Sequence, residues 1–144
     1  MIKQISVFLE NRPGALAEFA KLLQKSDIDL RALSLAETES FGIARLITDD
    51  AMATVTALKD AGYVCSLTNV VAVEVEDKPG ALVDILDVLG QRNINLEYTY
   101  AFLAKKANSA FLALRILDGE AAERVLNENG ISPLNQDDLQ ELFG

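Results

Sequence analysis

The sequence contains no histidine and no tryptophan, and it has only one cysteine and three prolines in 144 residues. Without histidine, the chain lacks the side chain most used for general base catalysis near neutral pH and for zinc binding. The single cysteine, Cys65, excludes an intramolecular disulfide, and its apolar surroundings indicate a small buried side chain. We therefore expect no metal site, no cofactor and no catalytic residues.

Basic side chains are also few: the sequence has 13 lysines and arginines against 22 aspartates and glutamates in number, so the formal net charge is −9. Such a chain cannot present the dense positive field that nucleic acid requires. No apolar run approaches the roughly 20 residues of a membrane span. The N-terminal residues 1–4 lack the apolar core of a signal peptide, so we expect a cytoplasmic protein that binds neither nucleic acid nor membrane.

What the sequence does contain is a repeated motif. Asn11-Arg12-Pro13-Gly14-Ala15-Leu16 returns as Asp77-Lys78-Pro79-Gly80-Ala81-Leu82, so the offset is 77 − 11 = 66 residues. Each copy follows an alternating apolar run and precedes a helical pattern. Proline suits a first helical position, glycine lets a ligand approach the backbone, and the free amides of a helix start attract an anion. The motif therefore predicts, twice, a strand-to-helix turn suited to a small anionic group.

The hydrophobic spacing predicts one unit written twice. The first copy reads as a strand around 5–9, a helix over 13–25, strands over 28–37 and 43–48, a helix over 50–61 and a strand over 63–67. Within 28–37 the apolar residues fall out of step, which indicates a bulge near Ala32. The second copy predicts strands over 71–75, 94–103, 111–117 and 131–134, helices after Pro79 and Asp118, and one or two terminal helical turns over 137–143. We expect an α+β chain of two ferredoxin-like βαββαβ units with antiparallel sheets packed side by side, covering 1–68 and 69–144.

The segments Glu10–Leu16 and Asp27–Leu30 together resemble the ACT domain, a small regulatory module, and Glu76–Leu82 with Asn93–Leu96 resembles it again. The two matches cover nearly the whole chain. The resemblance implies binding of an amino acid or a similar small molecule where two ACT domains pack together. The loop after the first strand would come from one domain and the start of the second strand from its neighbour.

The first loop, Glu10–Gly14, is most similar to that of the serine-binding ACT domain of phosphoglycerate dehydrogenase, in which one loop asparagine and one strand asparagine hold the ligand. If each loop packs against the other copy's second strand, Asn11 meets Asn95, whose amides suit a zwitterion. This site would comprise Asn11, Arg12, Pro13, Gly14, Ala15, Leu16, Asn93, Ile94, Asn95 and Leu96. The second site would pair two carboxylates, which repel an amino acid's carboxylate, and so is expected to be degraded or altered. It would comprise Asp77, Gly80, Ala81, Leu82, Ile28 and Asp29.

Two points stay open at this level. Dimerisation could instead build sites from like copies. Leu9 also stands where the serine-binding domain has a histidine, so a larger or more apolar amino acid is as plausible a ligand as serine. The simpler alternatives are that the Pro-Gly pairs are plain turns, that the asparagines are cap or strand residues, and that the aromatic row from Tyr98 to Phe102 is sheet packing or an interface.

Three classes of function follow. The first is a stand-alone amino-acid sensor or the regulatory subunit of a separately encoded enzyme of amino-acid metabolism, and in either case we expect a homodimer. The second is an ACT pair that binds no ligand and only holds subunits together. The third is an enzyme, and the sequence speaks against it, because it shows no nucleophile motif and no phosphate-binding loop.

Overall fold

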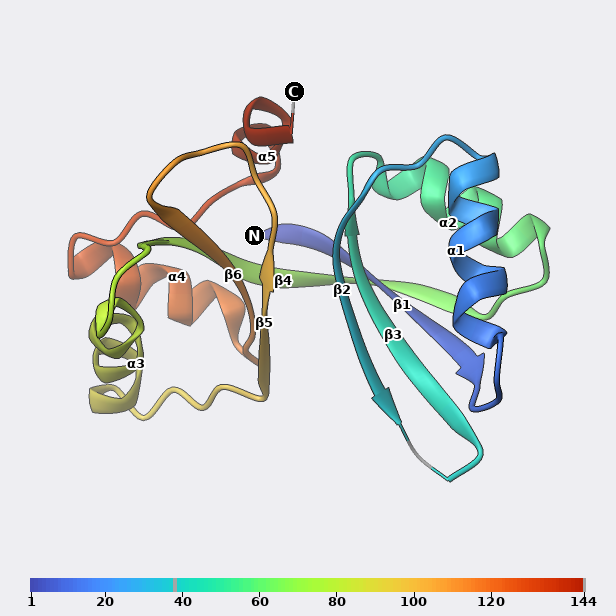
Figure 1. Cartoon of the computed structure of the whole chain (residues 1–144). Coiled ribbons are helices and arrows are strands. Elements are labelled where there is room, and N and C mark those ends of the chain that lie inside the picture. The colour runs from blue at the N-terminus through green and yellow to red at the C-terminus, as the bar shows by residue number, and fades with distance from the viewer. Residues whose placement is uncertain (38, 144) are drawn as a thin grey trace. The chain divides into compact units, whose positions relative to one another are not determined.

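The computed structural model describes residues 1–37 and 39–143. The chain divides into two compact units, Lys3–Thr68 and a second formed by Met1–Ile2 with Asn69–Gly144. In each unit two helices cover one face of an antiparallel sheet (Figure 1). The predicted fold class, an α+β chain of two ferredoxin-like units, is confirmed.

The first unit has the predicted order of elements. They are β1 (Ile2–Glu10), α1 (Ala15–Lys25), β2 (Leu30–Glu37), β3 (Phe41–Thr48), α2 (Ala51–Asp60) and the beginning of β4 (Cys65–Glu76). The strand order is β2-β3-β1-β4, and β1 and β2 both run antiparallel to β3. As a result β2 is the edge strand of this unit.

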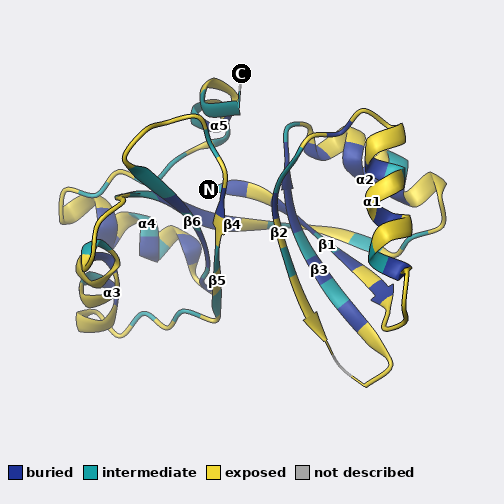
Figure 2. Cartoon of the chain, viewed as in Figure 1, coloured by how far each residue is buried: buried dark blue, intermediate teal, exposed yellow. Residues whose placement is uncertain are grey.

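The core of the first unit follows directly from the apolar spacing. Alternate residues of β1 point to one face of the sheet, and the stripe on α1 lies against them. Figure 2 shows buried positions recurring along β1 and β3, with exposed positions between them on β1 and half-buried ones on β3. The largest fully buried members of the core are Ile5, Phe19, Leu46 and Leu58. Full burial of such a side chain contributes about 1.5–3 kcal/mol.

The predicted bulge in β2 is confirmed, because the register with β3 shifts between Leu30 and Ala32. Beyond the shift, Leu33 lies opposite the core residue Leu46, so Leu33 and Leu35 face the helical side of the sheet. They nevertheless remain 40% and 50% exposed, since β2 is an edge strand with no neighbour to cover it.

The second unit repeats the arrangement without a strand after α4 (Gly119–Glu128), and it adds a terminal helix. Its elements are the remainder of β4, α3 (Ala81–Gln91), β5 (Tyr98–Phe102), β6 (Ser109–Arg115), α4 (Gly119–Glu128) and α5 (Gln136–Phe143). The strand order is β4-β6-β5, so β5 is the edge. Val71, Val73 and Leu114 of the sheet pack against Ile85, Leu89 and Leu126 of the helices.

Four predicted strands differ in the structure. The predicted strands over 63–67 and 71–75 form one continuous strand, because no turn-forming glycine or proline interrupts Cys65–Glu76. The predicted strand over 131–134 is wrong: within this described segment one backbone bond, from the Leu134 amide to the Ala72 carbonyl (2.8 Å), joins it to β4. The predicted strand over 94–103 shortens to β5, with consequences for the site.

The predicted terminal helix is confirmed as α5. Its start is held by reciprocal hydrogen bonds, in which the Asn135 amide donates to Asp138 (2.8 Å) and the Asp138 amide donates to the Asn135 side chain (2.9 Å). Leu139 is fully buried, and the Phe143 ring meets Phe102 edge-on at 6.4 Å. Because Phe102 pairs with Phe111, whose neighbours Ala110 and Leu112 point the other way, α5 covers the sheet face opposite α3 and α4.

Candidate functional site

The repeated loop between the first strand and helix has the same backbone conformation in both units. Gly14 and Gly80 each have φ +85°, the left-handed region, and each precedes the first residue of a helix. Only glycine adopts this conformation without strain. The expectation that proline occupies the first helical position is wrong, since α1 begins at Ala15 and Pro13 lies in the turn before it.

The loop is tied to the hairpin that follows it in each sheet. The Asn11 amide donates to the Ser40 carbonyl (3.3 Å), and the Asp77 amide donates to the Asn108 carbonyl (2.9 Å). No side chain caps the start of α1 or of α3 among the described residues. The Ala15 and Ala81 amides at these helix starts donate to the Arg12 and Lys78 carbonyls (3.3 Å in both). Part of the anion-binding capacity expected of a helix start is therefore already used.

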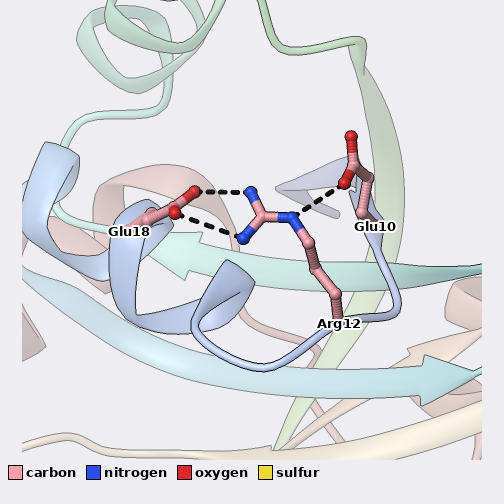
Figure 3. Close-up of polar contacts among 3 residues, drawn as sticks. All are labelled: Glu10, Arg12 and Glu18. Carbon is pink, nitrogen blue, oxygen red and sulfur yellow. Dashed lines mark hydrogen bonds and ion pairs between the residues drawn. The ribbon is translucent and has the colours of Figure 1, made fainter.

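Arg12 of this loop is already paired with carboxylates (Figure 3). Its Nε donates to Glu10 (2.8 Å), and its Nη1 and Nη2 donate to the two oxygens of Glu18 (3.2 and 2.8 Å). The hydrogen bonds to Glu18 and Glu10 raise the pKa of Arg12, and the same bond holds the pKa of Glu18 below its usual value. All three side chains are exposed, so the cluster orients the loop more than it stabilises the fold.

The second unit has a simpler version of this cluster. Lys78 pairs with Glu76 at 2.9 Å, and that bond raises the pKa of Lys78. A lysine makes a single-point contact where arginine forms a two-pronged one. The pairing of Lys78 therefore constrains its loop less than the pairing of Arg12 does.

Two cavities flank the first loop. A small one of about 90 Å³ lies on the side of the edge strand and includes Asn11, Leu16, Leu35 and Gly42 in its lining. A larger one of about 240 Å³ lies on the other side and includes Arg12 with Tyr63. The predicted loop residues Asn11, Arg12, Ala15 and Leu16 thus come together at the small cavity, next to the sheet edge.

The start of the second strand is closed in the first unit. The Asp29 amide donates to the Asp49 carboxylate (3.0 Å), and the Asp49 amide donates to the Asp29 carbonyl (3.1 Å). The carboxylate of Asp29 also pairs with Arg31 at 3.2 Å. Strand β2 can therefore begin at Leu30, because Asp29, the residue before it, is hydrogen-bonded to Asp49, the residue after β3.

The corresponding segment of the second unit is open. The ladder between β5 and β6 ends with the Glu97 amide, which donates to the Arg115 carbonyl (2.9 Å). Residues 94–97 are not strand, which shortens the predicted strand at its start. A cavity of about 400 Å³ remains here, lined by Asn93, Ile94, Asn95, Glu97, Ile116, Leu117, Asp118 and Ala121.

Asn93 has a structural role besides lining this cavity. Its φ is +57°, in the left-handed region that asparagine tolerates. Its backbone amide donates to the Gly90 carbonyl (3.1 Å), which ends α3. Asp27 ends α1 in the same way with φ +56°. Neither the Asn93 nor the Asn95 side-chain amide has a hydrogen-bond partner within residues 1–37 and 39–143.

The remaining predicted residues are distributed as follows. Ile28, Ile94 and Leu96 pack on the cores of their units. Ala81 lines a separate cavity of about 250 Å³ with Lys78, while Leu82 is exposed on α3. Sequence reasoning missed Glu97, Leu117 and Asp118. The sequence did hold a signal for Leu117, because Asp50 and Asp118 each cap the second helix of their unit. Aligning these two caps makes Leu117 the counterpart of Asp49.

Other kinds of site are not found in the described part of the chain. No group of three or more histidine, cysteine, aspartate or glutamate side chains is placed to hold a metal ion among residues 1–37 and 39–143. In the same residues no helix is both long and apolar enough to span a membrane.

A tandem of βαββαβ units, each with a Pro-Gly loop after its first strand, is the architecture of paired ACT domains. The chain belongs to the ACT domain pair family, whose model matches residues 1–143. The resemblance seen in the repeated loops is thereby confirmed. No protein with a curated description matches the chain.

Solved structures support the same assignment. Protein BT0572 from Bacteroides thetaiotaomicron is 36% identical, with a TM-score of 0.89 over 98% of this chain and 96% of that chain. The regulatory subunit of aspartate kinase from Thermus thermophilus, in a ligand-free form, shares 16% identity with a TM-score of 0.64 over 88% and 91% of the two chains. The corresponding subunit from Thermus flavus has a TM-score of 0.59 at 16% identity over 88% and 90%. The two kinase subunits show likeness of fold alone.

Proposed function

We propose that this chain is an amino-acid-binding regulatory protein, either a stand-alone sensor or the regulatory subunit of a separately encoded enzyme of amino-acid metabolism. The observation that carries the proposal is that an ACT fold has a cavity beside each of the two asparagines, Asn11 and Asn95. A cavity beside the Asn11 loop and an open cavity beside Asn95 each lie at the edge strand of a unit. Family membership makes an amino acid the first ligand class to test.

The ligand is proposed to bind where the loop of one ACT unit meets the second-strand start of another, with Asn11 and Asn95 in the same site. Primary amides both donate and accept, so a pair of them suits the carboxylate and ammonium of an amino acid. Asp29 and Asp77 would bring two carboxylates together instead. The structure of the first unit adds a reason against that site, because Asp29 is already bonded to Asp49 and Arg31.

A homodimer is part of the proposal. Strand β2 is an unpaired edge, and Leu33 and Leu35 leave apolar surface beside the Asn11 loop. Sheet edges of this kind are open to pairing with another chain. Ligand bound at such an interface would favour one relative arrangement of the ACT units, which is how a small effector can alter a partner enzyme.

The first test is a thermal-shift screen of the protein against the twenty amino acids, repeated with Asn11→Ala and Asn95→Ala. At 100 times its dissociation constant a ligand adds about 2.7 kcal/mol, which raises Tm by roughly 5–10 °C for a chain of this size. A shift lost in both variants supports the proposal. If none of the twenty amino acids shifts Tm, the result would favour the alternative, an ACT pair that only holds subunits together.

A mixed-dimer experiment then separates sites between chains from sites within one chain. Asn11→Ala and Asn95→Ala chains, carrying different affinity tags, are co-expressed and the mixed dimer is purified. If Asn11 and Asn95 meet across two chains, one intact site returns and half the wild-type stoichiometry is recovered. If the two residues meet within a chain, every site in the mixed dimer stays broken.

A further inference from the structure

We propose that the cavity beside Asn95 is the pocket for an amino acid with an apolar side chain, and that Leu117 is the residue that keeps it open. This inference rests on the proposed function and adds two things to it. It names the class of ligand, and it identifies a residue that explains why the second unit has an open site while the first does not.

The two units differ in the residue just before the cap of the helix that follows the third strand, next to the second-strand start. Asp50 and Asp118 are equivalent, because each caps the helix after the third strand and accepts a hydrogen bond from the amide three residues on (3.0 Å in both). The residues before them are therefore equivalent too. They are Asp49 in the first unit and Leu117 in the second.

That difference accounts for the open segment. In the first unit the Asp49 carboxylate accepts from the Asp29 amide and so holds the chain against β3. Leucine has no acceptor, and neither counterpart bond between Asn95 and Leu117 forms among the described residues. Residues 94–96, before the last ladder bond at Glu97, lie away from the sheet, and the cavity of about 400 Å³ lies beside them. Small-molecule pockets in proteins measure about 300–1,000 Å³.

The lining matches the parts of an apolar amino acid. Glu97 and Asp118 line the cavity and supply carboxylates for an ammonium group. Each already has one interaction: Glu97 lies 3.9 Å from the Arg115 guanidinium, and Asp118 accepts a hydrogen bond from the Ala121 amide (3.0 Å). The amides of Asn93 and Asn95 can donate to a carboxylate. Ile116 is buried and Leu117 is 80% exposed, so the lining offers both buried and exposed aliphatic surface. An anionic side chain on the ligand would face Glu97 and Asp118 and is disfavoured.

The test measures binding by calorimetry, with leucine, isoleucine and valine as apolar probes and serine and aspartate as polar ones. We expect the strongest binding from an aliphatic amino acid and at least tenfold weaker binding of aspartate. 4-Methylpentanoate, which is leucine without its ammonium, should also bind at least tenfold more weakly. A polar probe that binds more tightly than all three aliphatic ones overturns the inference.

Variants then test the pocket itself. Leu117→Asp installs the first unit's residue at an exposed position, where it should not disturb folding. We expect it to protect the Asn95 amide from hydrogen exchange and to weaken ligand binding at least tenfold. Ala121→Phe fills the same cavity by a different route and should weaken binding equally. Asp49→Leu, the matched exchange in the first unit, should leave affinity within twofold.

The outcomes separate this inference from the proposed function. An amino acid that binds normally to Leu117→Asp and Ala121→Phe, but not to Asn11→Ala, overturns the pocket and leaves the proposed function standing. If no amino acid binds the wild-type protein, both fail together. Loss of binding in both pocket variants, with the matched control unchanged, supports the inference.

Discussion

The Asp49→Leu substitution tests whether one carboxylate closes the second-strand start of the first unit. In the wild-type structure the Asp49 carboxylate accepts a hydrogen bond of 3.0 Å from the Asp29 amide, at an exposed position. A hydrogen bond to a charged acceptor contributes about 1.5–3 kcal/mol when buried and less when solvent competes, so we assign it about 1 kcal/mol. The substitution removes this acceptor and reproduces the residue found at the same place in the second unit.

Native-state hydrogen exchange is the most direct assay, because it reports the amide that loses its partner. A loss of about 1 kcal/mol lowers the protection of the Asp29 amide by roughly fivefold, if that amide exchanges by local opening. The effect should extend to Leu30 and stop within β2, since the β2–β3 ladder beyond it is unchanged. Global stability should fall by no more than about 1 kcal/mol.

Two further variants make the result decisive. Asp49→Asn keeps an oxygen acceptor and should retain most of the protection. Asp50→Ala removes the cap of α2, which costs a similar free energy of about 1 kcal/mol, but does not touch Asp29. If Asp49→Leu leaves exchange at Asp29 unchanged, or if Asp50→Ala increases it equally, then the account of open and closed segments is wrong.

Two other predictions concern stability. Gly14→Ala places a side chain at φ +85° and should lower the free energy of unfolding by about 1 kcal/mol, whereas Gly90→Ala inside α3 should raise it by up to about 1 kcal/mol, both seen in denaturant titrations. Glu74 has a lowered pKa because Lys106 and Ser109 donate hydrogen bonds to it. Its stabilising effect is therefore present above the ordinary glutamate pKa of about 4.3 and lost as pH falls through the lower folded value. Glu74→Gln should flatten the acid side of the stability curve, and an unchanged acid side would contradict this.

Local patterns were sufficient for most of the fold. The helix stripe through Phe19 and Leu23, the bulge near Ala32 and the cap at Asp118 all depend on neighbours within a few residues along the chain. Such features can be read from spacing because helix and strand periods differ. The strand expected over 131–134 failed because pairing with β4 depends on partners far away in sequence, and Leu134 supplies one bond there.

The candidate site divides in the same way. The repeated loops and the placement of Asn11 and Asn95 came from the sequence, as did family membership, since these rest on residue identity and offset. Arg12 is already paired with Glu10 and Glu18, and only the folded side-chain geometry reveals this pairing. Pairs of this kind depend on which carboxylates the folded backbone brings within reach.

By itself the sequence determined that this is a tandem of two ACT units, with one loop that recurs after 66 residues. Only the tertiary structure decided that one second-strand start is closed and the other open. The reason is physical: whether the chain there joins the sheet depends on an acceptor some 20 residues away, Asp49 opposite Asp29, and on its replacement by Leu117 opposite Asn95. The effect of replacing Asp49 by Leu117 can be seen only in the folded structure, where the third strand lies beside the second.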